Sequence, residues 1–216
     1  MINTERIDAY LDSLDTGNTE WLNSLEEYAL KTEVPIIRRP TQNLIRFLLA
    51  LKQPKQILEV GTAIGFSAIL MAQYSASDAH ITTIEKYEKR IPIAEENFEK
   101  SGFSYKITFL KGDAADILKE LETEGRTYDM IFMDAAKGQY MNFLPPIMSM
   151  MKSGSLLISD NVLQDGDIIE SRYAVTRRNR TIHSRMREYL YALTHDDTLI
   201  TDILPIGDGV ALTVRK

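Results

Sequence analysis

The chain contains no cysteine, one tryptophan, three histidines and no long apolar run. Without cysteine it forms neither disulfides nor thiolate metal sites. His80, His183 and His195 lie too far apart for the ligand spacing of a zinc site. No apolar stretch approaches the ~20 residues that span a bilayer, and the first residues lack the apolar region of a signal peptide. We therefore expect a cytoplasmic protein.

The chain also has no excess of positive charge. Its 216 residues carry a formal net charge of −6, which argues against a surface that binds nucleic acid everywhere, although a local basic patch is compatible with it. The length suits one well-buried domain, and the chain has no internal repeat, low-complexity tract or linker. We expect a single domain over residues 1–216.

Strand-like and helical stretches alternate along most of the chain. Such alternation predicts right-handed crossovers and a mostly parallel sheet with helices on both faces. The short link between residues 199–204 and 209–215 predicts a hairpin, which makes the last of seven strands antiparallel. The other predicted strands cover residues 56–60, 81–85, 106–111, 130–134 and 156–160.

Residues 1–32 are predicted to form an N-terminal helical extension. Two short amphipathic helices, broken near residues 15–18, place Leu22, Leu25 and Ala29 at helical spacing. We expect this pair to pack on the domain or on a second subunit. A lid over a substrate is the alternative.

Three predicted strand ends suggest a cofactor. The spacing Glu59-x-Gly61-x-x-x-Gly65 differs from the Gly-x-Gly-x-x-Gly loop that binds a dinucleotide pyrophosphate, and Glu59 would repel a phosphate. Glu85 can accept hydrogen bonds from both hydroxyls of a ribose. Asp113 either reaches an adenine amino group or only caps a helix. Together these ends fit an adenosine that carries a positive charge, and S-adenosylmethionine is that molecule.

Two further strand ends are acidic. Asp134 follows one apolar run, and Asp160 with Asn161 follows another. The carboxyl ends of parallel strands meet at the ligand-binding edge of a sheet, so two carboxylates and an amide oxygen predict a magnesium site there. The alternative is that both aspartates cap helices or form salt bridges. Lys137 places a titratable amine beside Asp134.

In their order and spacing these motifs resemble the metal-dependent O-methyltransferases of the catechol and caffeoyl-CoA type. The resemblance covers roughly residues 30–216 and rests on Glu59-x-Gly61-x-x-x-Gly65, Glu85, Gly112-Asp113-Ala114, Asp134-x-x-Lys137, Asp160-Asn161 and Gly207-Asp208-Gly209. It implies a Rossmann-like class I methyltransferase fold, S-adenosylmethionine and magnesium as cofactors, and a homodimer.

The resemblance also implies roles for single residues. Asp134, Asp160 and Asn161 would hold the metal. Lys137 and Asp134 would be the catalytic residues, with Lys137 as the general base. The alternative is that Lys137 is protonated and pairs with Asp134 or the substrate. The residues expected to bind the cofactor are Ile37, Glu59, Gly61, Ser67, Glu85, Asp113, Ala114 and Asp134.

A basic run lies on the predicted substrate side. Residues 172–187 carry six of the chain's thirteen arginines and no acidic residue. Near an active site we expect such a run to contact phosphate, whereas a solvated helix face is the alternative. The expected substrate contacts are Arg38, Arg39, Tyr140, Arg172, Arg177, Arg178 and Arg180, with Tyr140 or Tyr173 stacking on a base.

The expected phosphate contacts suggest two classes of methyl acceptor, coenzyme A esters and tRNA. Residues 134–140, together with the basic run, look most like the bacterial enzymes that methylate 5-hydroxyuridine in tRNA. The leading hypothesis is therefore methylation of the 5-hydroxyl of that base at the wobble position, where the loop is single-stranded, to give 5-methoxyuridine. An enzyme for catechol-like or caffeoyl-CoA-like small molecules is the second hypothesis, and a non-catalytic RNA-binding protein is the third.

Overall fold

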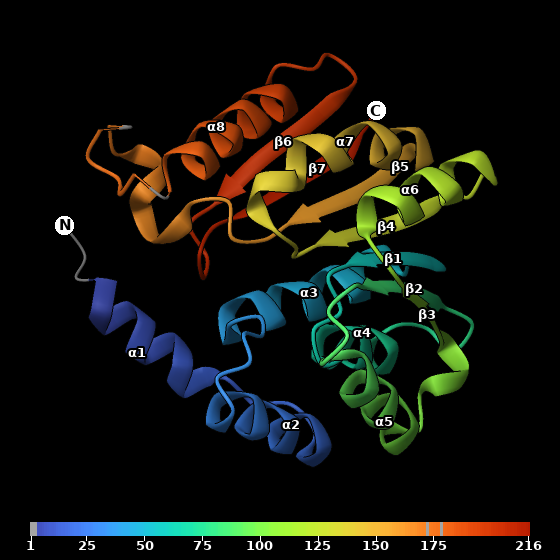
Figure 1. The fold of residues 1–216 in the computed structure, drawn as a ribbon. Coiled ribbons are helices and arrows are strands. Elements are labelled where there is room, and N and C mark those ends of the chain that lie inside the picture. The colour runs from blue at the N-terminus through green and yellow to red at the C-terminus, as the bar shows by residue number, and fades with distance from the viewer. Residues whose placement is uncertain (1–3, 172, 178) are drawn as a thin grey trace.

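The computed structural model describes residues 4–171, 173–177 and 179–216, which form a seven-stranded sheet with helices on both faces (Figure 1). The strand order is β3-β2-β1-β4-β5-β7-β6. Only β7 runs against its neighbours, β5 and β6, so the predicted fold class and its antiparallel last strand are confirmed. The strands are β1 (Gln56–Val60), β2 (His80–Glu85), β3 (Ile107–Lys111), β4 (Tyr128–Met133), β5 (Met151–Ser159), β6 (Leu199–Leu204) and β7 (Val210–Arg215).

The helices connect the strands in the predicted alternation. The α-helices are α1 (Thr4–Leu14), α2 (Glu20–Lys31), α3 (Arg39–Lys52), α4 (Phe66–Tyr74), α5 (Ile91–Ser101), α6 (Ala114–Thr123), α7 (Tyr140–Met150) and α8 (Arg180–Thr194). Short 3₁₀ helices cover Ser104–Lys106, Lys137–Gln139 and Gln164–Ile169. None of the helices formed by the described residues is long and apolar enough to cross a membrane.

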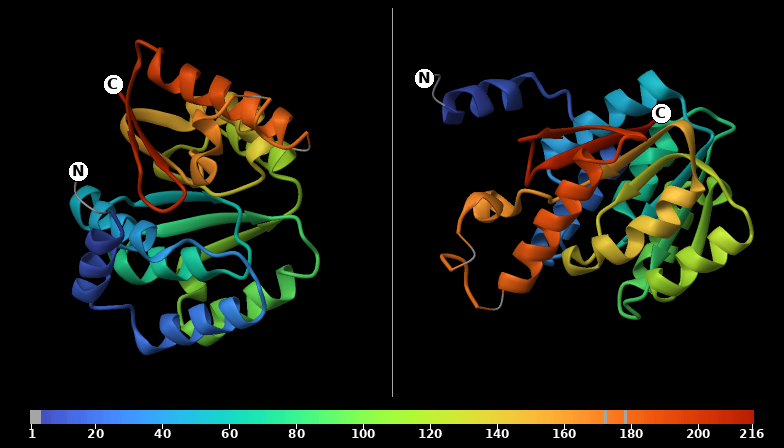
Figure 2. Two further views of the ribbon diagram at one scale, coloured as in Figure 1. Left: turned by 90° about the vertical axis from the view of Figure 1, so that its left-hand side faces the viewer. Right: turned by 90° about the horizontal axis from the view of Figure 1, so that it is seen from above.

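The sheet is buried on both faces, which explains why its central strands are almost continuously apolar. Side chains of β1 alternate between two cores: Ile57 packs with residues of α2, α3, α4 and α5, and Leu58 packs with residues of α6, α7 and α8. The views in Figure 1 and Figure 2 show these two helix layers on opposite sides of the sheet. Both layers hold the strand ends in fixed positions.

The N-terminal extension divides into a packed and an unpacked helix. Leu22, Leu25 and Ala29 of α2 are buried in the core, as the sequence predicts for a helix that packs on the domain. Every side chain of α1 that the structure describes is exposed. The described side chains of α1 do not pack on the domain, so for this helix packing on a second subunit, or a lid over a substrate, stays a prediction.

The chain order reverses between β1 and β4. From β1 the chain continues to β2 and β3 on one side, and β4 then starts the other half of the sheet. The loops after β1 and β4 consequently leave in opposite directions, and this point of an open parallel sheet is where ligands bind, beyond the carboxyl ends of the strands.

Candidate functional site

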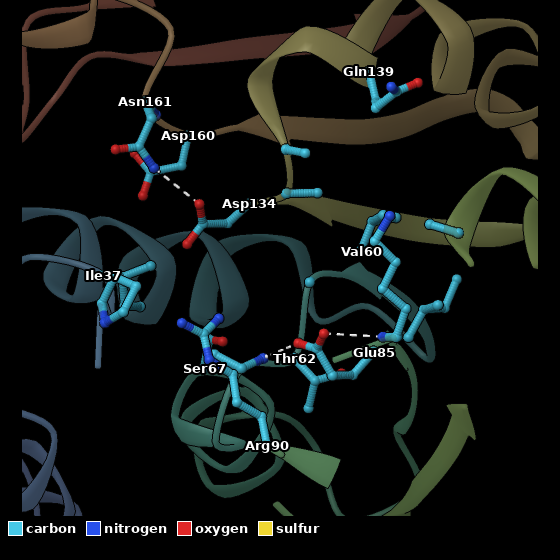
Figure 3. A pocket seen from close by; sticks show the side chains of 18 of the residues that line it. Ile37, Val60, Thr62, Ser67, Glu85, Arg90, Asp134, Gln139, Asp160 and Asn161 are labelled. Carbon is cyan, nitrogen blue, oxygen red and sulfur yellow. Dashed lines mark hydrogen bonds between the residues drawn. The ribbon is translucent and has the colours of Figure 1, made fainter. Parts of the chain in front are cut away.

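A cavity of about 780 Å³ lies at the carboxyl ends of β1, β2, β4 and β5 (Figure 3). The loop before α3, the β1–α4 turn, the start of α6 and the β6–β7 turn complete its walls. The structure brings together the following predicted site residues at its surface: Ile37, Arg38, Gly61, Ser67, Glu85, Asp113, Ala114, Asp134, Asp160 and Asn161.

Gly61 allows the β1–α4 turn to approach the end of β4. Its φ of +105° is a conformation that favours glycine. A Cβ atom at this position would lie 2.0 Å from the carbonyl oxygen of Asp134, which no side chain tolerates. The glycine therefore sets the spacing between the turn and the acidic strand end.

Glu85 is held rigidly at the end of β2. Its Oε2 accepts a hydrogen bond from the backbone N–H of Ala63 at 2.8 Å. Its Oε1 accepts from Lys86 at 2.9 Å and from Tyr87 at 2.8 Å. A carboxylate has about four acceptor sites, so capacity for ligand hydroxyls remains. The ribose contact is a prediction that this geometry allows.

Asp113 caps α6 and also lines the cavity. Its Oδ1 accepts from the backbone N–H of Ala115 at 2.9 Å, and its Oδ2 pairs with Lys86 at 3.1 Å. The hydrogen bond from Ala115, followed by that from Lys86, lowers the pKa of Asp113. The capping alternative is confirmed, and the adenine contact stays a prediction.

Glu59 departs from its predicted role as a cofactor contact. It is fully buried and does not line the cavity. Thr83 donates a hydrogen bond to its carboxylate, and the Thr83 hydroxyl lies 2.6 Å from that of Thr62. Burial, which outweighs these hydrogen bonds, raises the pKa of Glu59 to about 7. Glu59 is therefore linked to the cavity only indirectly, through Thr83 and the cavity-lining Thr62.

The acidic strand ends converge on one side of the cavity, as Figure 3 shows. Asn161 has a φ of +61°; its backbone N–H donates to Asp160 Oδ1 at 2.8 Å, and its Nδ2 donates to Asp134 Oδ1 at 2.9 Å. Burial raises the pKa of both carboxyls, and the nearby charge of Asp134 helps to bring that of Asp160 to about 7.

Asp160 is buried and Asp134 is half-buried. Asp160 is only 3% exposed, and among the described residues no cationic side chain forms an ion pair with it or with Asp134. Buried carboxylates without a cationic partner are strongly unfavourable. A divalent cation would relieve that cost.

The donor set fits magnesium, which prefers oxygen ligands and keeps positions for substrate oxygens. Rotating the Asn161 amide by 180° would present its oxygen in place of the nitrogen. In the part of the chain that the structure describes, no cluster of three or more His, Cys, Asp or Glu side chains has metal-binding geometry. The candidate ligands are therefore two carboxylates and one amide.

Asp208 is a residue of this site that sequence reasoning missed as a candidate ligand contact. It lies in the β6–β7 turn, lines the cavity, and pairs with Arg38 at 2.6 Å. Its charge raises the pKa of Asp134 and Asp160. The flanking glycines, Gly207 and Gly209, were the available signal. Arg90, Gln139 and Phe143 also line the cavity without having been predicted.

Lys137 lies at the edge of the acidic site. Its charge lowers the pKa of Asp134 and Asp160, against the effect of burial. It does not line the cavity, and no salt bridge within the described residues joins it to either carboxylate. Its role as general base stays a prediction.

Two predicted substrate contacts are wrong. Tyr140 is 1% exposed, and its hydroxyl donates to the carbonyl oxygens of Met133 at 3.2 Å and Asp160 at 3.0 Å. It therefore ties the ends of β4 and β5 together and cannot stack on a base. Arg39 does not line the cavity and instead pairs with Glu26 and Asp15, so its charge is neutralised within the protein.

The described residues of the basic run lie beside the site and do not line the cavity. Arg177 is exposed, Arg180 lies with its guanidinium 5.8 Å from the ring centre of the exposed Tyr173, and Arg185 donates to the carbonyl oxygen of Gly138 at 2.7 Å. The last of these interactions places α8 next to the loop that carries Lys137. The predicted contacts Arg172 and Arg178 lie outside the described residues.

Comparison with known proteins agrees with this geometry. A family model described as O-methyltransferase matches residues 12–216. A catechol O-methyltransferase of Niastella koreensis is 31% identical over 98% of this chain and 97% of its own length. A candidate caffeoyl-CoA O-methyltransferase of Staphylococcus aureus is 32% identical, with a TM-score of 0.86 and 98% of each chain covered.

A third relative shares the fold at lower identity. The O-methyltransferase of Bacillus cereus, solved in complex with SAH, is 22% identical with a TM-score of 0.85, over 98% of this chain and 97% of that one. The family match spans nearly the whole chain, including all the strands that form the cavity. This chain belongs to the O-methyltransferase family and is an S-adenosylmethionine-dependent enzyme.

Proposed function

We propose that the enzyme is magnesium-dependent and methylates one of two adjacent oxygens on its acceptor. The observation that carries this proposal is the pair of neighbouring carboxylates, the half-buried Asp134 and the buried Asp160, that lack a cationic partner among the described residues. They lie in the same cavity as Ser67, Glu85 and Asp113, which fit the adenosine and methionine parts of the donor.

Residues at the two ends of the cavity have different proposed roles. Glu85 and Asp113 hold the adenosine, while Asp134, Asp160 and Asn161 hold the cation. The cation, when bound, lowers the pKa of an acceptor hydroxyl and fixes its direction. Tyr140 keeps the two strand ends in register through its hydrogen bonds to both.

Lys137 is the proposed base for the acceptor proton. It adjoins the acidic site, where the acceptor hydroxyl would be held. Methyl transfer itself is a displacement at the sulfonium methyl carbon that needs no covalent bond to the protein. Alignment and charge therefore supply most of the catalysis.

A catechol-like phenol is the first candidate acceptor. Its two neighbouring hydroxyls match the proposed metal site, and the Niastella koreensis relative is a catechol O-methyltransferase that aligns with nearly the whole chain. A caffeoyl-CoA-like ester belongs to the same class, because its ring carries the same oxygen pair.

A tRNA base, 5-hydroxyuridine, is the second candidate acceptor. It offers a hydroxyl next to a carbonyl, which is again an adjacent oxygen pair. The observation that favours it is the basic run, which reaches the Lys137 loop through Arg185 and exposes Arg177. In a protein of net charge −6, such a run suits a phosphate backbone.

One labelling assay separates the candidates. Enzyme, magnesium and S-adenosylmethionine with a labelled methyl group are incubated with catechol, with phenol, with tRNA bearing 5-hydroxyuridine, or with tRNA lacking it. Both candidates predict that phenol and unhydroxylated tRNA stay unlabelled. Labelled catechol alone supports the first, and labelled hydroxylated tRNA supports the second. Tight tRNA binding without any labelling would instead favour the non-catalytic hypothesis.

The tRNA candidate makes a second prediction about salt. Replacing Arg177 and Arg180 with alanine should weaken tRNA binding and lower its logarithmic salt slope by about 0.7–0.9 for each phosphate that the variant no longer neutralises. Arg126→Ala is the control, because Arg126 lies beside the amino end of β4, opposite the site. An unchanged slope in the double variant would remove the basic run from the interface.

A further inference from the structure

The loop between β4 and α7 is fixed by the sheet and the core at both of its ends. Where it starts, the backbone N–H of Asp134 donates to the carbonyl oxygen of Val60 at 3.0 Å. Where it ends, the buried Tyr140 donates to the carbonyl oxygens of two strand ends. Between these points the chain forms the half-buried 3₁₀ helix Lys137–Gln139. The position of Lys137 therefore depends on what holds the tip of this loop.

Arg185 of α8 holds the tip from a distant part of the chain. Its Nη1 donates to the carbonyl oxygen of Gly138 at 2.7 Å, across 47 residues of sequence. A Cβ atom placed on Gly138, which follows Lys137 directly, would lie 3.7 Å from Arg185 Nη1 and 4.0 Å from Ile182 Cγ1, so the tip lies against α8. Among the described residues, no other side chain is hydrogen-bonded to the backbone of residues 136–139.

The same helix also anchors the loop that follows Asn161. Arg187 Nη1 donates to the carbonyl oxygen of Ile168 at 3.1 Å, and His183 Nε2 lies 3.1 Å from the carbonyl oxygen of Glu170. Both Ile168 and His183 are buried. Helix α8 therefore fixes two loops at once: one that carries the proposed base, and one that begins with a proposed metal ligand.

The packing of α8 on the sheet does not depend on Arg185. Met186 and Tyr189 are fully buried on the opposite side of the helix from solvent, and the Tyr189 hydroxyl lies 2.6 Å from that of Ser159 in β5. Arg185 itself is exposed. Truncating Arg185 should therefore leave the helix in place and remove its link to Gly138.

We propose that Arg185 is a positioning residue that sets the place of Lys137 relative to the metal ligands, through the carbonyl oxygen of Gly138. The inference rests on the proposed function, because it takes Lys137 as the base. A general base must lie within hydrogen-bond reach of the proton that it removes, and a displacement of about 1 Å in such an alignment costs up to about 100-fold in rate. Loss of the link should therefore lower kcat.

Hydrogen exchange of the full-length protein, followed by mass spectrometry, tests the link without turnover. Arg185→Ala should speed exchange in the peptide over residues 135–142 by about 10-fold, the equivalent of one hydrogen bond to a charged donor, and leave residues 162–170 at the wild-type rate. Arg187→Ala is the matched control, because it removes an arginine of the same helix that holds the other loop, and it should do the reverse. Arg185→Lys keeps a charged donor and should exchange more slowly than Arg185→Ala.

Steady-state rates give the second measurement. The acceptor is catechol or tRNA bearing 5-hydroxyuridine, whichever the labelling assay shows to be methylated. Arg185→Ala should lower kcat by about 10- to 100-fold with a smaller change in either KM, and Arg185→Lys should restore part of the loss. In a Lys137→Met background the Arg185→Ala change should have no further effect, because both changes act on the same base.

The outcomes separate this inference from the proposed function. Unchanged exchange of residues 135–142 in Arg185→Ala, or a wild-type kcat in that variant where Lys137→Met is impaired, would overturn the inference and leave the proposed function standing. A higher KM for tRNA at unchanged kcat would also overturn it, because Arg185 would then be only a phosphate contact. A wild-type kcat in Lys137→Met, or labelling of neither acceptor, would refute the proposed function and the inference with it.

Discussion

Replacing Glu59 with glutamine tests the buried network beneath the cofactor end of the cavity. The Glu59 carboxylate is fully buried and accepts a hydrogen bond from Thr83. Glutamine keeps the size of the side chain and an oxygen that accepts a hydrogen bond, but it does not titrate. The two proteins should therefore differ in how their stability depends on pH.

The sign and size of the effect follow from the pKa. Burial raises the pKa of Glu59 from an ordinary value of 4.5 to about 7, so the folded protein binds this proton more tightly than the unfolded chain does. The stabilisation is fully present below pH 4.5 and is lost as the pH rises through about 7. The difference corresponds to roughly 3 kcal/mol of unfolding free energy.

Urea unfolding of metal-free protein at pH 5, 6, 7 and 8 measures this dependence. Relative to wild type, Glu59→Gln should gain stability from pH 5 to pH 8, by about 2.5 kcal/mol in total, with most of the gain below pH 7. Glu99→Gln, at an exposed position on α5, should track wild type throughout. A Glu59→Gln difference that stays constant with pH, or that shrinks as the pH rises, would refute the reasoning.

Three further variants test the site. Asp160→Asn should abolish turnover while calorimetry shows S-adenosylmethionine binding within a few-fold of wild type. Gly61→Ala should destabilise the protein by several kcal/mol in urea unfolding, because its Cβ would clash with the carbonyl oxygen of Asp134. Gly102→Ala is its control and should cost only about 1 kcal/mol, since Gly102 has a φ of +75° but open space around its Cβ position. Tyr140→Phe should lower the free energy of unfolding by about 1 kcal/mol, and it should reduce kcat by a larger factor than it changes the KM for S-adenosylmethionine. A kcat equal to that of wild type would contradict the positioning role of Tyr140.

The sheet could be predicted from sequence because its strands are buried on both faces and read as short apolar runs between turns. The start of β5 could not. Residues 151–155 include lysine, two serines and glycine, which disfavour strands. They nevertheless belong to β5, which pairs with β4 at Met151 and again from Leu156, across a register shift between Tyr128 and Met130. The start of β5 is therefore decided by pairing between segments that are distant in sequence, which a local sequence pattern does not indicate.

The candidate site was predictable to the extent that it lies at strand ends. Asp134, Asp160 and Glu85 line the cavity because parallel strands share one carboxyl edge. The misplaced residues depend on distant partners. The Tyr140 hydroxyl binds the carbonyl oxygens of two separate strands, and Arg39 pairs with acidic residues of the N-terminal extension, so neither is open to a substrate.

The same limit applies to Glu59 and Asp208. A glutamate beside a glycine turn suggests a ligand contact, but whether it faces the cavity or the core depends on the twist of β1 against its neighbours. Asp208 lies in a hairpin turn whose position over the site is set by the pairing of β7 with β5. The positions of both side chains are therefore set by the arrangement of the whole sheet and not by the local sequence.

Binding of Mn²⁺, followed by electron paramagnetic resonance, tests the account at its centre. Asp134, Asp160 and Asn161 should bind one Mn²⁺ per chain, Mg²⁺ should displace it, and Asp160→Asn should abolish the bound signal. Unchanged Mn²⁺ binding in that variant, or no saturable binding by wild type, would contradict the claim that these strand ends hold a divalent cation.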